Sequence, residues 1–84
     1  MADFLRFFED KVKVFPMHFT LTYSKTCDWE LEIMKHNCAE YYPEADLDGD
    51  DVIIFRGQDL DLELLCAKAH AALKEWLIEY ESGY

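Results

Sequence analysis

Two stretches of alternating apolar and polar residues constrain the fold of this chain more than any other feature. Residues 17–24 place an apolar side chain at every second position, and residues 27–34 do so again after the short link Lys25-Thr26. Because successive side chains of a β-strand point to opposite faces, the pattern predicts two half-buried strands joined as a hairpin. The side chains predicted to point inward are Met17, Phe19, Leu21, Tyr23, Cys27, Trp29, Leu31 and Ile33.

The next part of the chain is predicted to form a long connection and then a third strand. Residues 37–50 contain Pro43 and Gly49, which favour a loop. The run at residues 52–55 is apolar on both faces, which is typical of a strand in the centre of a sheet. Gly57 is predicted to end this strand.

Helices are predicted at both ends of the chain. A short helix over residues 3–15 is expected to have Asp3 as its cap and Pro16 as its stop. From about Asp59 the apolar residues recur every three or four positions, which predicts a long helix ending at Ser82. Its start stays open, because its first residues also alternate like a strand. Its predicted core stripe is Leu62, Leu65, Ala69, Leu73, Trp76, Leu77 and Tyr80.

Together these elements predict one α+β domain over residues 1–84. Their order is α-β-β-β-α, with a three-stranded antiparallel sheet and helices packed on one face. A content of 51% hydrophobic residues is sufficient for a packed core. Double-stranded RNA-binding domains share this order, but they need basic residues at the start of the last helix, where this chain has Asp59, Asp61 and Glu63.

Negative charge is concentrated in the middle of the chain. The sequence holds 18 acidic and 8 basic residues, for a net charge of −10. Residues 28–63 contain twelve of the acids and only two of the bases, whereas the remainder contains six of each. Charge confined in this way creates a strong local field that the fold must hold against self-repulsion. The thirteen aromatic residues argue against a disordered acidic tail, so a rigid body is expected to display the acids.

Two sets of acids are predicted to form a partner-binding surface. If the helices cover the Trp29 side of the sheet, the acids of the second strand lie in a row on the open side. Alternate strand residues are roughly 6.6–6.8 Å apart, which is similar to the spacing of phosphates along a nucleic-acid strand. The loop that follows adds an acidic ridge and two aromatic anchors. The predicted partner-binding residues are Asp28, Glu30, Glu32, Glu40, Tyr41, Tyr42, Glu44, Asp46, Asp48, Asp50 and Asp51. The alternative is an acidic surface that only aids solubility.

No metal site or cofactor is predicted. The pairs His36-x-Cys38 and Cys66-x-x-x-His70 have spacings that zinc sites use. However, the alternation of side chains along the strand points His36 outward and Cys27 inward, and nothing fixes Cys38 near Cys66. Buried free cysteines and edge histidines are the expected roles.

Enzymatic activity is not predicted either. The acidic run from Asp46 is not an EF-hand, because its glycine comes fourth and its twelfth residue is Gly57. Carboxylates that hold magnesium for phosphodiester cleavage need cations to admit a polyanion, and the acidic region has only Lys35 and Arg56. The sequence contains no glycine-rich phosphate loop and no legible nucleophile–base arrangement.

The remaining composition predicts a cytoplasmic protein. The three cysteines lack the spacing of a disulfide framework, and Met1-Ala2-Asp3 lacks the features of a signal peptide. No apolar run reaches the roughly 20 residues that a membrane span needs. An acidic chain is also repelled by anionic membranes and by nucleic acid, so neither is an expected partner.

The C-terminal helix carries a second apolar ridge opposite its core stripe. This ridge predicts either a self-association site or contact with the first helix. Its residues are Leu60, Leu64, Ala67, Ala71 and Ile78.

In size, charge and order of elements the chain resembles small acidic phage-encoded anti-defence proteins, such as anti-CRISPR proteins and anti-restriction DNA mimics. That resemblance implies a non-enzymatic inhibitor in the host cytoplasm, bound to the basic DNA- or RNA-binding groove of a CRISPR effector or similar protein. Two other hypotheses remain open. One is an adaptor that homodimerises through its C-terminal helix, and the other is an acidic antitoxin.

Overall fold

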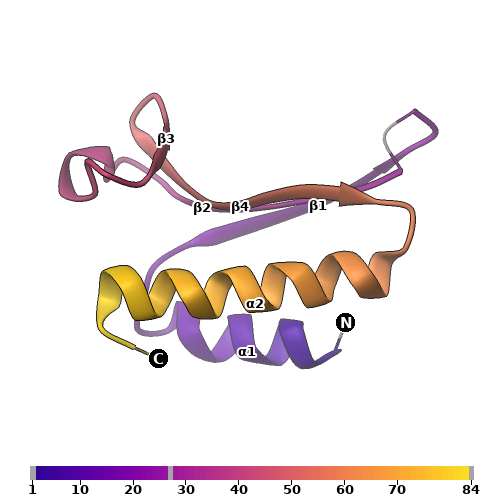
Figure 1. The fold of residues 1–84 in the computed structure, drawn as a ribbon, viewed down its shortest axis with the longest axis horizontal. Helices are drawn as coiled ribbons and strands as arrows, with labels where there is room; N and C mark the ends of the chain where they lie inside the picture. The colour runs from indigo at the N-terminus through magenta and orange to yellow at the C-terminus, as the bar shows by residue number, and fades with distance from the viewer. Residues whose placement is uncertain (1, 27, 84) are drawn as a thin grey trace.

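The computed structural model describes residues 2–26 and 28–83, which form two helices and a four-stranded sheet. The elements are α1 (Ala2–Val12), β1 (His18–Ser24), β2 (Asp28–Lys35), the 3-10 turn η1 (Ala39–Tyr41), β3 (Asp46–Asp48), β4 (Asp51–Asp59) and α2 (Leu62–Glu81). All strand pairs are antiparallel, in the order β1-β2-β4-β3. Both helices lie on one side of the sheet (Figure 1). The predicted α+β class is confirmed, but the predicted number of three strands is wrong.

The additional strand, β3, lies within the segment that was predicted to be a loop. It is three residues long and pairs with the start of β4 across a tight turn, with Asp48 opposite Asp51. Gly49 takes a φ of +64° in this turn, a conformation that glycine adopts without strain. Since aspartate is depleted in strands, the sequence Asp-Leu-Asp gave no strand signal.

The strand β4 is longer than the predicted four residues and continues past Gly57. The register shifts between β2 and β4, so that Ile33 pairs with Phe55 and Met34 with Ile53. The extra residue, Ile54, forms a β-bulge, and this explains how consecutive apolar residues of β4 face the helices. A Cβ at Gly57 would lie 2.7 Å from the Phe55 ring, so the glycine makes room for that ring and does not end the strand.

The helix α2 begins at Leu62, three residues later than predicted. Asp61 is its N-cap, and the Asp61 carboxylate accepts hydrogen bonds from the backbone N–H groups of Glu63 and Leu64, at 3.0 and 3.3 Å. Asp59 belongs to β4 and not to the helix. It forms a 3.0 Å ion pair with Lys68.

The helix α1 is shorter than predicted and ends at Val12. Asp3 lies in its first turn and is not its cap. A turn follows in which the Phe15 N–H donates to the Lys11 carbonyl at 2.8 Å. The rings of Phe4 and Phe8 pack edge-on against Phe19 of β1, so α1 covers the β1 side of the sheet.

The core lies between the sheet and the helices, and it contains most residues that were predicted to face inward. Tyr23 is an exception, because 58% of its surface is exposed although it stacks on Trp29 at 4.8 Å. Tyr23 lies near the C-terminal end of β1, which bends away from the helices (Figure 1). The predicted inward side chain of Cys27 lies outside the described residues. None of the described helices has the length and apolar character needed to cross a membrane.

Candidate acidic interface

The acids of β2 lie on the open face of the sheet. Glu30 pairs with Thr22 and Gln58 on the neighbouring strands, and Glu32 pairs with Arg56. Their neighbours in β2, Leu31 and Ile33, are fully buried on the opposite face. Asp28 lies at the start of the strand, so all three acids of the predicted row come from β2.

The remaining predicted acids lie at one end of the molecule. In Figure 1 the β3–β4 hairpin and the preceding 3-10 turn project from the sheet, at the end where α2 stops. The exposed acids of this segment are Glu40, Glu44, Asp46, Asp48 and Asp50. We call residues 37–51 the acidic loop. A cavity of about 300 Å³ opens within it and is lined by Asn37, Ala39, Glu40 and Asp50.

Backbone hydrogen bonds close the acidic loop at its base. The Asp50 carbonyl accepts from the N–H groups of both Cys38 and Ala39 at 3.0 Å. The Asp51 carboxylate accepts from the Asn37 N–H, also at 3.0 Å, and this bond is the main cause that lowers the pKa of Asp51. The two ends of the loop are therefore tied together, which limits the conformations that its acids can adopt.

Tyr42 fixes the loop to the end of α2. Its hydroxyl donates to the Glu81 carboxylate at 2.5 Å and accepts from the Lys35 ammonium at 3.3 Å. Its ring packs on Trp76 and Tyr80, at centroid distances of 5.3 and 6.0 Å. Burial, followed by the bond to Glu81, raises the pKa of Tyr42 to about 12. These internal contacts half-bury Tyr42, so it holds the loop and is not free to anchor a partner.

Tyr41 differs from its neighbour, because 72% of its surface is exposed. Of the two predicted aromatic anchors, Tyr41 is thus the one available to a partner. The sequence pair Tyr41-Tyr42 did not distinguish these roles.

Some of the acids are compensated within the fold. The Arg56 guanidinium contacts Glu32 at 2.6 Å and Asp48 at 3.4 Å, and the bond to Glu32 is the main cause that raises the pKa of Arg56. Asp51 contacts His36 at 3.2 Å. Within the described part of the chain, no ion pair involves the other acids of the predicted surface. These uncompensated acids are Asp28, Glu30, Glu40, Glu44, Asp46 and Asp50.

Two features at this end of the molecule were not predicted from the sequence, namely a pair of histidines and the acid Glu79. The rings of His18 and His36 are tilted at a centroid distance of 4.4 Å beside Asp51, where the start of β1 meets the residue that follows β2. Glu79 adds to the charge of the acidic loop, since burial and then the charges of Glu79, Glu44 and Asp46 raise the pKa of Tyr80. The last turn of α2 contains no base. Acids at the negative end of a helix dipole are unfavourable, so this clustering opposes folding.

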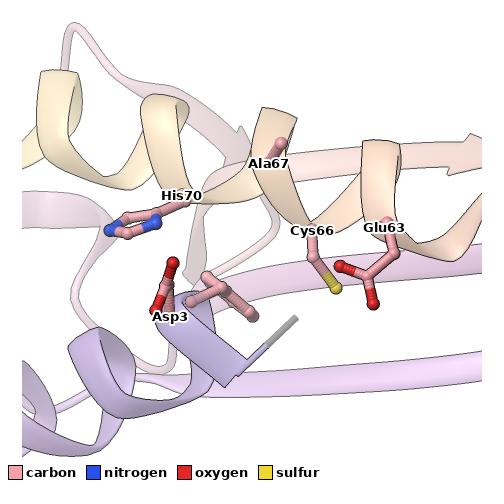
Figure 2. A pocket seen from close by; sticks show the side chains of 6 residues that line it. Asp3, Glu63, Cys66, Ala67 and His70 are labelled. Carbon is pink, nitrogen blue, oxygen red and sulfur yellow. The ribbon is translucent and has the colours of Figure 1, made fainter.

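A second cavity, of about 220 Å³, lies between α1 and α2. Figure 2 shows that Asp3 approaches it from α1, whereas Glu63, Cys66, Ala67 and His70 line it along α2. The Nε2 atom of His70 is buried there without a hydrogen-bond partner. Burial, followed by the charge of Lys74, lowers the pKa of His70, and burial raises the pKa of the Cys66 thiol.

Neither histidine–cysteine pair belongs to a metal cluster in residues 2–26 and 28–83. No three histidine, cysteine, aspartate or glutamate side chains in this part of the chain are arranged to hold a metal ion. The Cys38 thiol instead donates to the Lys35 carbonyl at 3.5 Å.

The apolar ridge predicted on α2 is exposed and is not covered by α1. Leu64, Ala71 and Ile78 lie on the solvent side of the helix, and Ala67 lines the second cavity. Leu60 precedes the helix and is 75% exposed. The predicted alternative, in which this ridge packs against the first helix, is therefore wrong for its large side chains.

Three comparisons with known proteins complete the description of this interface. A scan against protein-family models, a search of curated proteins and a search of solved structures each found no match.

Proposed function

We propose that this protein is a non-enzymatic inhibitor that binds the basic groove of a nucleic-acid-binding protein, in the manner of an anti-CRISPR or DNA-mimic protein. The observation that carries this proposal is the position of the uncompensated acids. They lie on a strand of the sheet and on a loop that is closed at its base and attached to α2 through Tyr42.

Rigid attachment matters for such a function because ordering a flexible segment costs free energy on binding. Anions that the fold already holds in place avoid much of that cost. A groove built for nucleic acid presents Lys and Arg side chains that release counterions when they meet phosphates. Fixed carboxylates at a similar spacing offer the same groove a ligand that cannot be unwound or cleaved.

The charge at the C-terminal end of α2 also supports the proposal. Glu81 is paired with Lys35 at 3.5 Å, but Glu79 adds to the negative end of the helix dipole beside the acidic loop. This arrangement does not favour folding, whereas it strengthens the field that a cationic partner would meet.

The direct test is inhibition of DNA cleavage by a panel of purified CRISPR effector complexes. One variant replaces Glu40, Glu44, Asp46 and Asp50 by their amides. The matched control makes the same change in charge at Asp3, Glu9, Asp10 and Glu75, which are exposed acids on the helices. We expect the loop variant to lose inhibition and the control to keep it. Equal potency of the two variants would contradict the proposal.

A second candidate function rests on the exposed ridge of α2. Leu64 and Ile78 are large apolar side chains on the solvent side of the helix, as expected of an adaptor that associates through this surface. Light scattering of the Ala71→Glu variant tests this candidate. Loss of a dimer in this variant, combined with no inhibition of any effector by the wild type, would favour the adaptor.

A further inference from the structure

One edge of the sheet is formed by β1, and its sequence is unusual for this chain. Residues 18–23 read His-Phe-Thr-Leu-Thr-Tyr and contain no acidic or basic residue apart from the histidine, although the protein has a net charge of −10. Their backbone pairs with β2 on one side, and no described strand or loop pairs with them on the other side. An edge strand of this kind is a template for another strand.

Strand pairing with a second copy of this chain is unfavourable at the opposite edge of the sheet. This edge is formed by β3, whose Asp46 and Asp48 flank a single leucine, and beyond β3 by residues 54–59 of β4, which include Arg56 and Asp59. Two β3 strands paired edge to edge would bring like charges directly opposite one another, which is destabilising. Of the two edges, β1 is the one that carries no acidic, lysine or arginine side chain.

We propose that β1 pairs with β1 of a second copy of the protein, antiparallel and about a two-fold axis at Leu21. On the open face this register places Thr20 of one copy opposite Thr22 of the other. On the helix face it places Phe19 opposite Tyr23, and so covers the tyrosine ring that is 58% exposed in the single chain. Every pair on both faces is uncharged or aromatic, as stable cross-strand pairs commonly are.

The same arrangement keeps the acidic loops of the two copies apart. The strand order across the dimer becomes β3-β4-β2-β1-β1-β2-β4-β3, an antiparallel sheet with all helices on one face. The two β3 strands are then separated by seven interstrand spacings, or roughly 34 Å. That distance is about four Debye lengths at physiological ionic strength, so the repulsion between the loops is screened.

Sedimentation equilibrium of the full chain tests the proposal. The wild type is expected to have a mass of twice 9.9 kDa, and the Thr20→Lys/Thr22→Lys variant is expected to be a monomer. Both threonines are exposed, so lysine is tolerated by the single chain, whereas in the dimer each lysine faces another. The matched control is Gln58→Lys, an exposed position on the open face of β4, which β2 separates from β1, and it should remain a dimer.

Amide hydrogen exchange supplies a second readout. In the wild type, alternate β1 amides should be protected, and the lysine variant should lose that protection while β2 and β4 keep theirs. A monomeric wild type would overturn the proposal. So would a dimer that survives both lysines, or one that is lost on Ala71→Glu and not on Thr20→Lys/Thr22→Lys, since the latter result would place the contact on α2.

Discussion

The two edges of the sheet differ in the charge of their side chains. The edge opposite β1 consists of the three residues of β3 and of residues 54–59 of β4, and it carries aspartates and Arg56. The β3–β4 hairpin bends away from the helices (Figure 1). The β1 edge is seven residues long and carries no carboxylate or lysine. Charge blocks strand pairing at one edge, and its absence permits pairing at the other. If both proposals hold, the surface for a cationic partner and the surface for a second copy lie on different parts of the molecule.

The edges also differ in how they are attached to the rest of the fold. The acidic loop is attached to α2 through the half-buried Tyr42 and its contacts with Glu81, Lys35 and Trp76. The β1 side depends on α1, whose rings pack on Phe19. Each attachment can be removed by a separate substitution, so the two sides of the molecule can be tested independently.

The largest effect is expected from Tyr42→Ala. Loss of the ring that packs on Trp76 and Tyr80 should reduce the free energy of unfolding by roughly 2–3 kcal/mol, less than for a fully buried aromatic. Chemical denaturation measures this value. Tyr41→Ala, at the exposed neighbour, is the matched control and should stay within about 0.5 kcal/mol of the wild type. If the two variants are equally stable, Tyr42 does not hold the loop.

A pH titration of stability tests the α1 side of the molecule, where His70 lines the second cavity. Burial and Lys74 lower the pKa of His70 from its usual 6.5, against the opposing charge of Asp3. Between 6.5 and the lower value, the unfolded chain binds a proton that the folded chain does not, so stability falls as the pH decreases through this range. Thermal unfolding of wild type and His70→Leu from pH 7 to pH 5 checks this. The wild type should lose stability and the leucine variant should lose less. Parallel curves would contradict the role given to His70.

A smaller effect is expected from Arg56→Gln. This change releases Glu32 and Asp48 from their shared guanidinium and makes the acidic face more negative. If the face binds a basic groove, affinity for that partner should rise severalfold at low salt. Lys68→Gln is the matched control, because it releases Asp59 away from the loop. A loss of affinity in Arg56→Gln would show that the ion pair itself is recognised, and would contradict binding by free anions.

Much of the fold was predictable because alternation and helical periodicity record which side chains face the core. The hairpin of β1 and β2, the open-face position of Glu30 and Glu32, and the core stripe of α2 followed from this record. β3 was not predictable, since its aspartates disfavour strands and its pairing depends on the turn at Gly49. The bulge at Ile54 was likewise hidden, because a continuous apolar run fits a regular central strand equally well.

The acids of the candidate interface could be predicted from the sequence, but which of them are paired with a cation could not. Compensation of Glu32 by Arg56 depends on the register of β2 and β4, and compensation of Asp48 depends on the β3–β4 hairpin, neither of which local sequence specifies. The division of roles between Tyr41 and Tyr42 depends on where α2 ends. Contacts between residues far apart in the chain decided both outcomes.

Competition with duplex DNA tests the central claim most directly. The protein is titrated into a complex of a CRISPR effector with a labelled duplex, over a series of salt concentrations. We predict that the wild type displaces the duplex and that its apparent affinity falls steeply as salt rises, whereas the loop amide variant displaces none. Displacement that does not depend on salt, or that the amide variant retains, would contradict an account based on fixed anions.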